Sequence, residues 1–124
     1  MIAIQAITAY TAVTQLMDQE CDFQTAYELL QIKKKLEEPA EFFKNNEHAL
    51  MLKYADKNEE GAVTVDAEGR FTISGAEEVK KYAEERLNLG KVEINWPHKP
   101  VTIKKPEKIK PVMLEALDGI IEFI

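Results

Sequence analysis

The chain has 124 residues, of which 45% are hydrophobic and 31% are charged, a composition typical of one globular domain. Sixteen Lys and Arg residues against 22 Asp and Glu residues give a formal net charge of −6, which argues against a general binder of nucleic acid or of anionic membranes. A single cysteine, Cys21, excludes a disulfide framework.

The sequence gives no targeting or membrane signal. Residues 1–7 lack the basic start and the cleavage site of a signal peptide, and no apolar run reaches the length of a membrane-spanning helix. No internal repeat and no linker is apparent. We therefore expect a single domain over residues 1–124, located in the cytoplasm of the cell that makes it.

The first expected elements are an extended start and a helix. Ile2 and Ile4 alternate with small or polar residues, which favours a short strand. Apolar residues then recur at helical spacing, namely Ala6, Ala9, Tyr10, Val13, Leu16 and Met17. Either Cys21 or Asp22 lies near the start of the next helix, and Asp22 is the better N-cap by its chemistry.

The strongest periodic pattern runs from Phe23 to Tyr54 and predicts an amphipathic helix. Its apolar positions are three or four residues apart, with one missing turn: Leu29, Ile32, Leu36, Ala40, Phe43, Leu50 and Tyr54. Pro39 conflicts with a helix, because a proline inside a helix removes one backbone hydrogen bond. Since the apolar stripe keeps its phase across Pro39, we favour one long, kinked helix over two separate helices.

A hairpin and another helix are expected next. Residues 63–65 and 71–73 alternate between apolar and polar side chains around a loop that contains glycine, which predicts two antiparallel strands. Ser74 and Glu77 have the spacing of a capping box, and Gly90 closes the helix that follows. The predicted buried face of this helix consists of Ala76, Val79, Ala83 and Leu87.

Further strands and an apolar helix complete the chain. Residues 92–96 alternate and predict a third strand, and Val101 with Ile103 suggests a fourth. Four apolar residues at helical spacing predict a C-terminal helix: Met113, Leu117, Ile120 and Ile124. A strand over residues 120–124 is the alternative, because β-branched residues and Gly119 favour it.

Together these elements predict an α+β fold. It consists of a helical hairpin with one long amphipathic helix, a small antiparallel β-sheet with its hairpin, and a C-terminal apolar helix. The amphipathic helices carry more apolar surface than one small core needs, so we also expect self-association.

The loop after the long helix carries the pattern closest to a chemical motif. Asp56, Asn58 and Glu60 occupy positions 1, 3 and 5 of an EF-hand calcium loop, and Gly61 occupies position 6. Position 12, where a bidentate Glu completes the calcium site, is Ala67. The alternative is a turn in which Asp, Asn and Gly shape the backbone, and the loss of the strongest ligand favours the turn.

Residues 91–110 are basic within an acidic chain. They include six Lys and two Glu residues, a local charge of +4 that leaves −10 for the rest of the chain. A possible interaction surface here consists of Trp96, Lys99, Lys104, Lys105 and Lys108. The segment contains no Arg, the residue that phosphate recognition prefers, which argues against nucleic-acid binding. An exposed charged edge that discourages aggregation is the alternative.

No residue pattern predicts catalysis. His48 and His98 have no nucleophile, carboxylate or second metal ligand at a recognisable spacing. Cys21 is flanked by Glu20 and Asp22, surroundings that do not activate a thiol. We therefore expect a protein without enzymatic activity, cofactor or metal.

Several segments spread over the chain form a further pattern: Met1 to Gln5, Ala26 to Glu38, Lys53 to Gly61, Asp66 to Phe71, Val92 to Ile94, Leu114 to Leu117 and Ile120 to Phe123. In these segments the sequence resembles a family of phage and prophage proteins of Gram-positive bacteria, known as domain of unknown function 1617. Pro39 departs from the uninterrupted charged helix expected there. The resemblance implies a phage origin and a place in the bacterial host cytoplasm or the virion, but it supplies no activity and no site residues.

Two functions follow as hypotheses. The favoured one is a non-enzymatic phage-encoded protein that acts through protein–protein contacts, as a virion assembly or accessory factor. The alternative is an acidic phage inhibitor of a host defence or DNA-binding protein, whose carboxylates imitate nucleic acid. Acidic clusters such as residues 37–41, 59–60, 77–78 and 84–85 suggest this alternative, although solubility explains them equally well.

Overall fold

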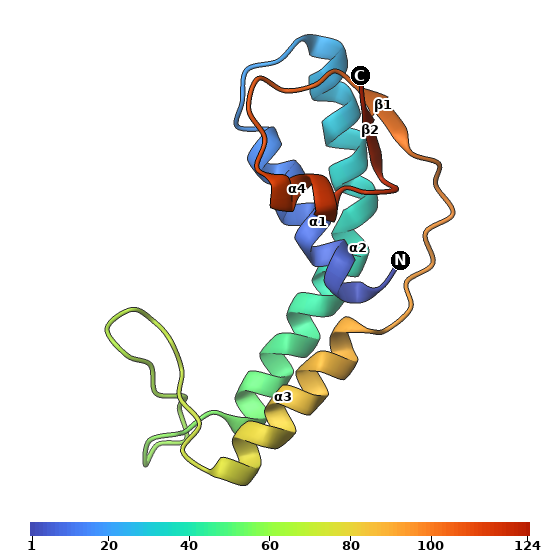
Figure 1. Cartoon of the computed structure of the whole chain (residues 1–124). Helices are drawn as coiled ribbons and strands as arrows, with labels where there is room; N and C mark the ends of the chain where they lie inside the picture. Colours follow the sequence, from blue (N-terminus) through green and yellow to red (C-terminus); the bar gives the residue numbers. More distant parts are fainter.

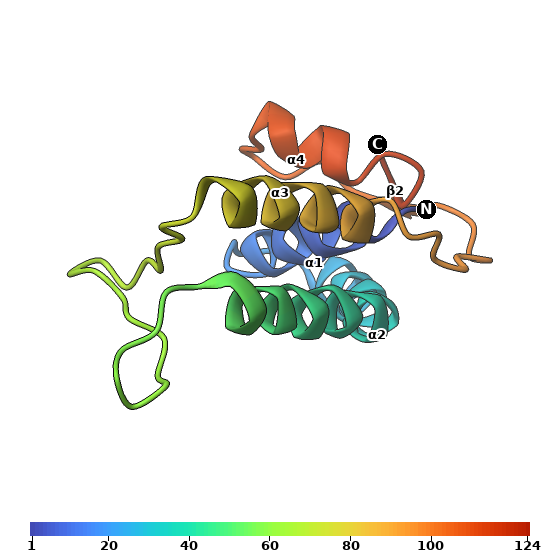
Figure 2. The same cartoon turned by 90° about the horizontal axis from the view of Figure 1, so that it is seen from below.

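The computed structural model describes residues 1–124 and consists of four helices and two short strands. The elements are α1 (Ala3–Leu16), α2 (Phe23–Tyr54), α3 (Ala76–Gly90), β1 (Val101–Ile103), α4 (Pro111–Ala116) and β2 (Ile121–Phe123). Figure 1 shows that α1, α4 and both strands lie beside the first half of α2, whereas α3 lies beside its second half. Seen from below, α1 lies between α2 and α4 (Figure 2).

α1 and α2 form the predicted helical hairpin, because only residues 17–22 connect them. The buried face of α1 is made mostly of alanine and consists of Ala3, Ala6, Ala9, Ala12, Val13 and Leu16. Small side chains on one helix let the backbone of a neighbouring helix approach closely. The predicted extended start is limited to the first two residues, where Ile2 forms an antiparallel bridge with Glu93.

α2 is one continuous helix through Pro39, as favoured from the phase of its apolar stripe. Its buried residues are Leu29, Ile32, Leu36, Ala40 and Phe43. Pro39 offers no N–H to the carbonyl of Lys35, and Lys35 is exposed, so water can satisfy that oxygen. The predicted N-cap is confirmed, because Asp22 Oδ1 accepts a hydrogen bond from the backbone N–H of Thr25 at 2.8 Å.

The sheet is parallel, so the predicted antiparallel sheet is wrong. β1 and β2 pair in parallel, with Thr102 opposite Glu122. The segment between them contains α4 and brings the chain back, so that β2 runs in the same direction as β1. Residues 92–96, the predicted third strand, make only the bridge to Ile2, and Pro97 follows with no N–H to extend a ladder.

The predicted C-terminal helix forms only in its first half, and the prediction is wrong for the second half. α4 ends at Ala116, and the alternative strand is confirmed over Ile121–Phe123. Gly119 has a φ of 77°, a left-handed conformation that glycine adopts without strain, and it turns the chain from α4 into β2. Leu117 and Ile120 lie on either side of this turn and are both buried in the core.

Residues 56–74, here called the double turn, project beyond the ends of α2 and α3 (Figure 1). Their sequence contains two related units, NEEGAVTV and DAEGRFTI, so the expectation of no internal repeat is wrong. In each unit the first side chain accepts hydrogen bonds from the backbone two and four residues later, at 2.9 to 3.0 Å. The predicted hairpin strands are reduced to one bridge between Val65 and Phe71.

Candidate functional site

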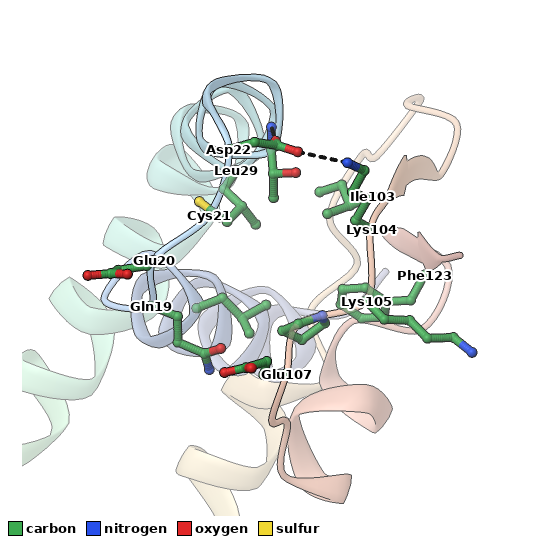
Figure 3. A pocket seen from close by; sticks show the side chains of 13 residues that line it. Gln19, Glu20, Cys21, Asp22, Leu29, Ile103, Lys104, Lys105, Glu107 and Phe123 are labelled. Atoms are coloured by element: carbon green, nitrogen blue, oxygen red, sulfur yellow. Dashed lines mark hydrogen bonds and ion pairs between the residues drawn. The ribbon is translucent and has the colours of Figure 1, made fainter.

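A pocket of about 190 Å³ lies between the turn that joins α1 to α2 and the segment that follows β1 (Figure 3). Its apolar lining consists of Leu16, Leu29, Ile103 and Phe123 together with Pro106. Its polar and charged lining includes Gln19, Glu20, Asp22, Lys104, Lys105 and Glu107. The volume is smaller than the roughly 300 to 1,000 Å³ of small-molecule sites.

An ion pair joins two sides of this pocket. Lys104 Nζ donates to Asp22 Oδ2 at 3.0 Å, while Asp22 Oδ1 caps α2 through Thr25. Both charged side chains remain largely exposed, so the pair contributes little to stability by itself. Its structural effect is to tie the end of β1 to the start of α2.

Replacing Asp22 by Asn is expected to reduce the loss of stability in acid. The pKa of Asp22 is lowered from 3.8 to about 2, first by the backbone N–H of Thr25, then by the Thr25 side chain and by Lys104. Folding therefore favours the carboxylate, and the stabilisation that it gives above about pH 4 is lost as pH falls towards 2. Thermal midpoints measured over this range should fall further for the wild type than for Asp22→Asn. Asp18→Asn, on the exposed turn, is the control and should follow the wild type.

The structure divides the predicted interaction surface. Lys104 and Lys105 line the pocket, whereas Trp96 lines a different groove, and Lys99 and Lys108 line neither. All four lysines are exposed. The five residues therefore form an extended basic edge rather than one site.

The groove beside Trp96 has a volume of about 440 Å³ and runs against the middle of α2. Trp96 meets His98 edge to face at a ring distance of 4.7 Å, and Pro39 and Phe42 line the α2 side of the groove. The indole Nε1 of Trp96 is buried without a hydrogen-bond partner. Sequence reasoning singled out Trp96 but gave no sign that it shares a groove with the proline of the long helix.

The residues that resemble a calcium loop serve the backbone of the double turn. The carboxylate of Asp56 accepts from Ser74 Oγ at 2.5 Å, from Ser74 N at 3.0 Å and from Thr72 Oγ1 at 3.0 Å. These bonds, the Ser74 hydroxyl first, lower the pKa of Asp56. Asn58 Oδ1 accepts from backbone amides, and the side chain of Glu60 is exposed. No group of three or more His, Cys, Asp or Glu side chains is arranged to hold a metal ion.

The predicted capping box does not form. Gly75 is the N-cap of α3, and no side chain caps the helix. The hydroxyl of Ser74 donates to Asp56 instead, which anchors the end of the double turn to its beginning. The spacing of Ser74 and Glu77 could not reveal that Asp56 takes the hydroxyl of Ser74, because Asp56 lies 18 residues earlier in the chain.

Asp56→Ala is expected to loosen the double turn while both helices stay folded. The substitution removes the acceptor of three hydrogen bonds from Thr72 and Ser74, which close the base of the double turn. Limited proteolysis should then cleave residues 57–73 several-fold faster than in the wild type. Glu59→Ala is the matched control, since the exposed side chain of Glu59 lies within the same loop. Equal cleavage rates for the two variants would contradict this role of Asp56.

The apolar face of α3 does not lie where the sequence predicts. The residues expected in the core are all exposed, and they are called here the α3 outer stripe: Ala76, Val79, Ala83 and Leu87. α3 instead turns Tyr82 and Leu89 towards the rest of the protein. Tyr82 packs edge to face on Tyr54 and Phe71, with ring distances of 6.3 Å and 5.7 Å.

Comparisons of this chain with protein families, with curated proteins and with solved structures find no match. The resemblance to domain of unknown function 1617 therefore stays a prediction from the sequence. None of the four helices combines the length and the apolar character needed to cross a membrane.

Proposed function

We propose that this is a non-enzymatic, phage-encoded protein that acts through protein–protein contacts, as a virion assembly or accessory factor. Its proposed location is the cytoplasm of the bacterial host or the virion. The family resemblance supports the phage origin, and the surface of the molecule supports the mode of action.

The observation that carries the proposal is the large exposed surface. The chain exposes 8599 Å² and buries only 19 of its 124 residues. A compact monomer of 14.1 kDa exposes about 6,700 Å², so this molecule exposes roughly 1,900 Å² more. Each partner in a specific protein–protein interface buries about 800 Å², which the excess exceeds.

Part of this surface is apolar and ordered along helices. Phe23, Tyr27 and Leu30 follow one another at helical spacing on α2, opposite its buried stripe, and form the α2 outer stripe. Their exposed fractions are 96%, 59% and 37%. Together with the α3 outer stripe they give two rigid apolar faces, the kind of surface that marks protein-interaction sites.

Affinity capture from phage-producing host cells tests the proposal. The tagged full chain should recover virion or assembly proteins. Phe23→Ser with Leu30→Ser should reduce their recovery, because both side chains are exposed and their loss leaves the core unchanged. Lys105→Glu with Lys108→Glu tests the basic edge, and Lys104 is left in place because it holds Asp22.

One result would overturn the proposal in favour of the alternative. An inhibitor that imitates nucleic acid should recover a single host defence or DNA-binding protein, and raising the salt concentration should release it. Recovery of virion proteins through apolar contacts should instead resist salt.

A further inference from the structure

The α3 outer stripe is an amphipathic helix face without a partner inside the chain. Val79 and Leu87 are 46% and 61% exposed, and Ala76 and Ala83 are exposed with them. Among the helices and strands, α3 contacts only α1 and α2, through other residues. Apolar residues three and four positions apart normally pack a helix against a core, but in α3 these residues face solvent.

The buried Leu89 and the packing of Tyr82 on Tyr54 set this orientation, and two ion pairs join α2 and α3 beside them. Arg86 Nη2 lies 2.8 Å from Glu47 Oε2, and Lys53 Nζ lies 3.1 Å from Glu85 Oε1. At the C-terminal end of α3, Gly90 is packed so closely on Ile4 of α1 that an added Cβ would lie 3.2 Å from its side chain. Rotating α3 to bury its outer stripe would break these contacts, so the stripe stays available to another molecule.

We infer that the α3 outer stripe docks onto the same stripe of a second copy of this chain, with the two α3 helices antiparallel. This inference rests on the proposed function, action through protein contacts, and names one partner. Its basis is the apolar stripe together with the order of charges along its flank. That order is Glu77, Lys80, Glu84 and Lys91.

The flanking charges select the antiparallel arrangement. When two copies are centred on Ala83, Lys80 of one copy lies within about 3 Å along the axis of Glu84 of the other, and Glu77 lies equally close to Lys91. Each of these pairs has opposite signs and occurs twice by symmetry, which outnumbers the one like-charged pair, Glu84 with Glu84, that lies equally close at the axis. In a parallel arrangement this flank of one copy would lie beside the opposite flank of the other, so none of these pairs would form.

The apolar residues of the α3 outer stripe also fit an antiparallel pair centred on Ala83. Val79 of one copy then faces Leu87 of the other, and the small Ala83 lies at the twofold axis, where it permits close approach of the helices. α3 has 15 residues and a length of about 22 Å, so the stripe alone buries less than a standard interface. The expected dimer is therefore reversible, with a dissociation constant of roughly micromolar size.

Light scattering coupled to size-exclusion chromatography of the full chain tests the dimer. Between about 1 and 200 µM the mean mass should rise from one chain towards two. Leu87→Glu should hold the protein at the mass of one chain across this range, while circular dichroism shows an unchanged helix content. Leu30→Glu, on the α2 outer stripe, is the matched control and should dimerise as the wild type does. Lys105→Glu with Lys108→Glu should also dimerise.

Charge exchange and cross-linking test the direction of the helices. Lys80→Glu alone and Glu84→Lys alone should each weaken dimerisation about tenfold, and the double exchange should restore it. In a Cys21→Ser background, Ala83→Cys should form an intermolecular disulfide on oxidation, whereas Ala76→Cys should not, because only Ala83 lies at the axis. Cross-linking of both variants would indicate parallel helices and overturn the arrangement.

The outcomes separate this inference from the proposed function. A wild type that stays monomeric, or a Leu87→Glu variant that still dimerises, overturns the inference. Capture of virion proteins by such a monomer would leave the proposed function standing. A dimer that captures no virion protein would support the inference and contradict the proposed function.

Discussion

Leu36→Ala is expected to lower the free energy of unfolding by about 2 to 5 kcal/mol. Leu36 is fully buried on α2, in the cluster that joins α2 to α1, β1 and the C-terminal segment. Removing its three distal carbons costs the transfer of buried apolar groups and leaves a cavity that two rigid helices close only in part. Urea unfolding followed by circular dichroism measures the loss.

Leu30→Ala is the matched control, because it makes the same chemical change on the opposite face of the same helix. Leu30 is 37% exposed, and its substitution should cost less than about 1 kcal/mol. Equal losses at the two positions would mean that the core does not lie between α1 and α2 as described.

Ala9→Leu is expected to destabilise the protein by about 1 to 3 kcal/mol through overpacking. Ala9 is fully buried on the alanine face of α1, within the main core cluster. A leucine there has no space unless α1 and α2 move apart, which would loosen every other contact between them. The thermal midpoint should fall, and the unfolding transition should broaden if the helices separate.

Thr11→Leu is the control for this substitution. Thr11 lies two residues away on the exposed side of α1, so a leucine there should change stability by no more than about 0.5 kcal/mol. A neutral Ala9→Leu variant would show that the two helices are not in close contact at this level.

Helical periodicity predicted the parts of the fold in which one face of a helix meets one neighbour. The stripe of α2 through Leu36 and Phe43 was correct even across Pro39, and the N-cap at Asp22 followed from its chemistry. Such features depend on residues within a few turns of one another, which is the range over which a single sequence is informative.

The same reasoning failed where distant segments compete for a residue. Periodicity detected the stripe of Val79 and Leu87 but could not tell a buried face from an exposed one. Ser74 has the spacing of a cap, yet its hydroxyl is used by Asp56. Whether a parallel pair of strands forms depended on where α4 ends, because the chain has to turn at Gly119 before residues 121–123 can form β2 beside β1. The pocket beside Asp22 and Lys104 joins residues 82 positions apart, and no local pattern announces it.

The double turn has a consequence for how this chain can vary in length. Asp56 pairs through its backbone with Thr64 at the end of the first unit and with Thr72 at the end of the second. Both units therefore return the chain to the same point between α2 and α3. Loss or duplication of one eight-residue unit would therefore change how far the double turn projects, while its base stays at Asp56.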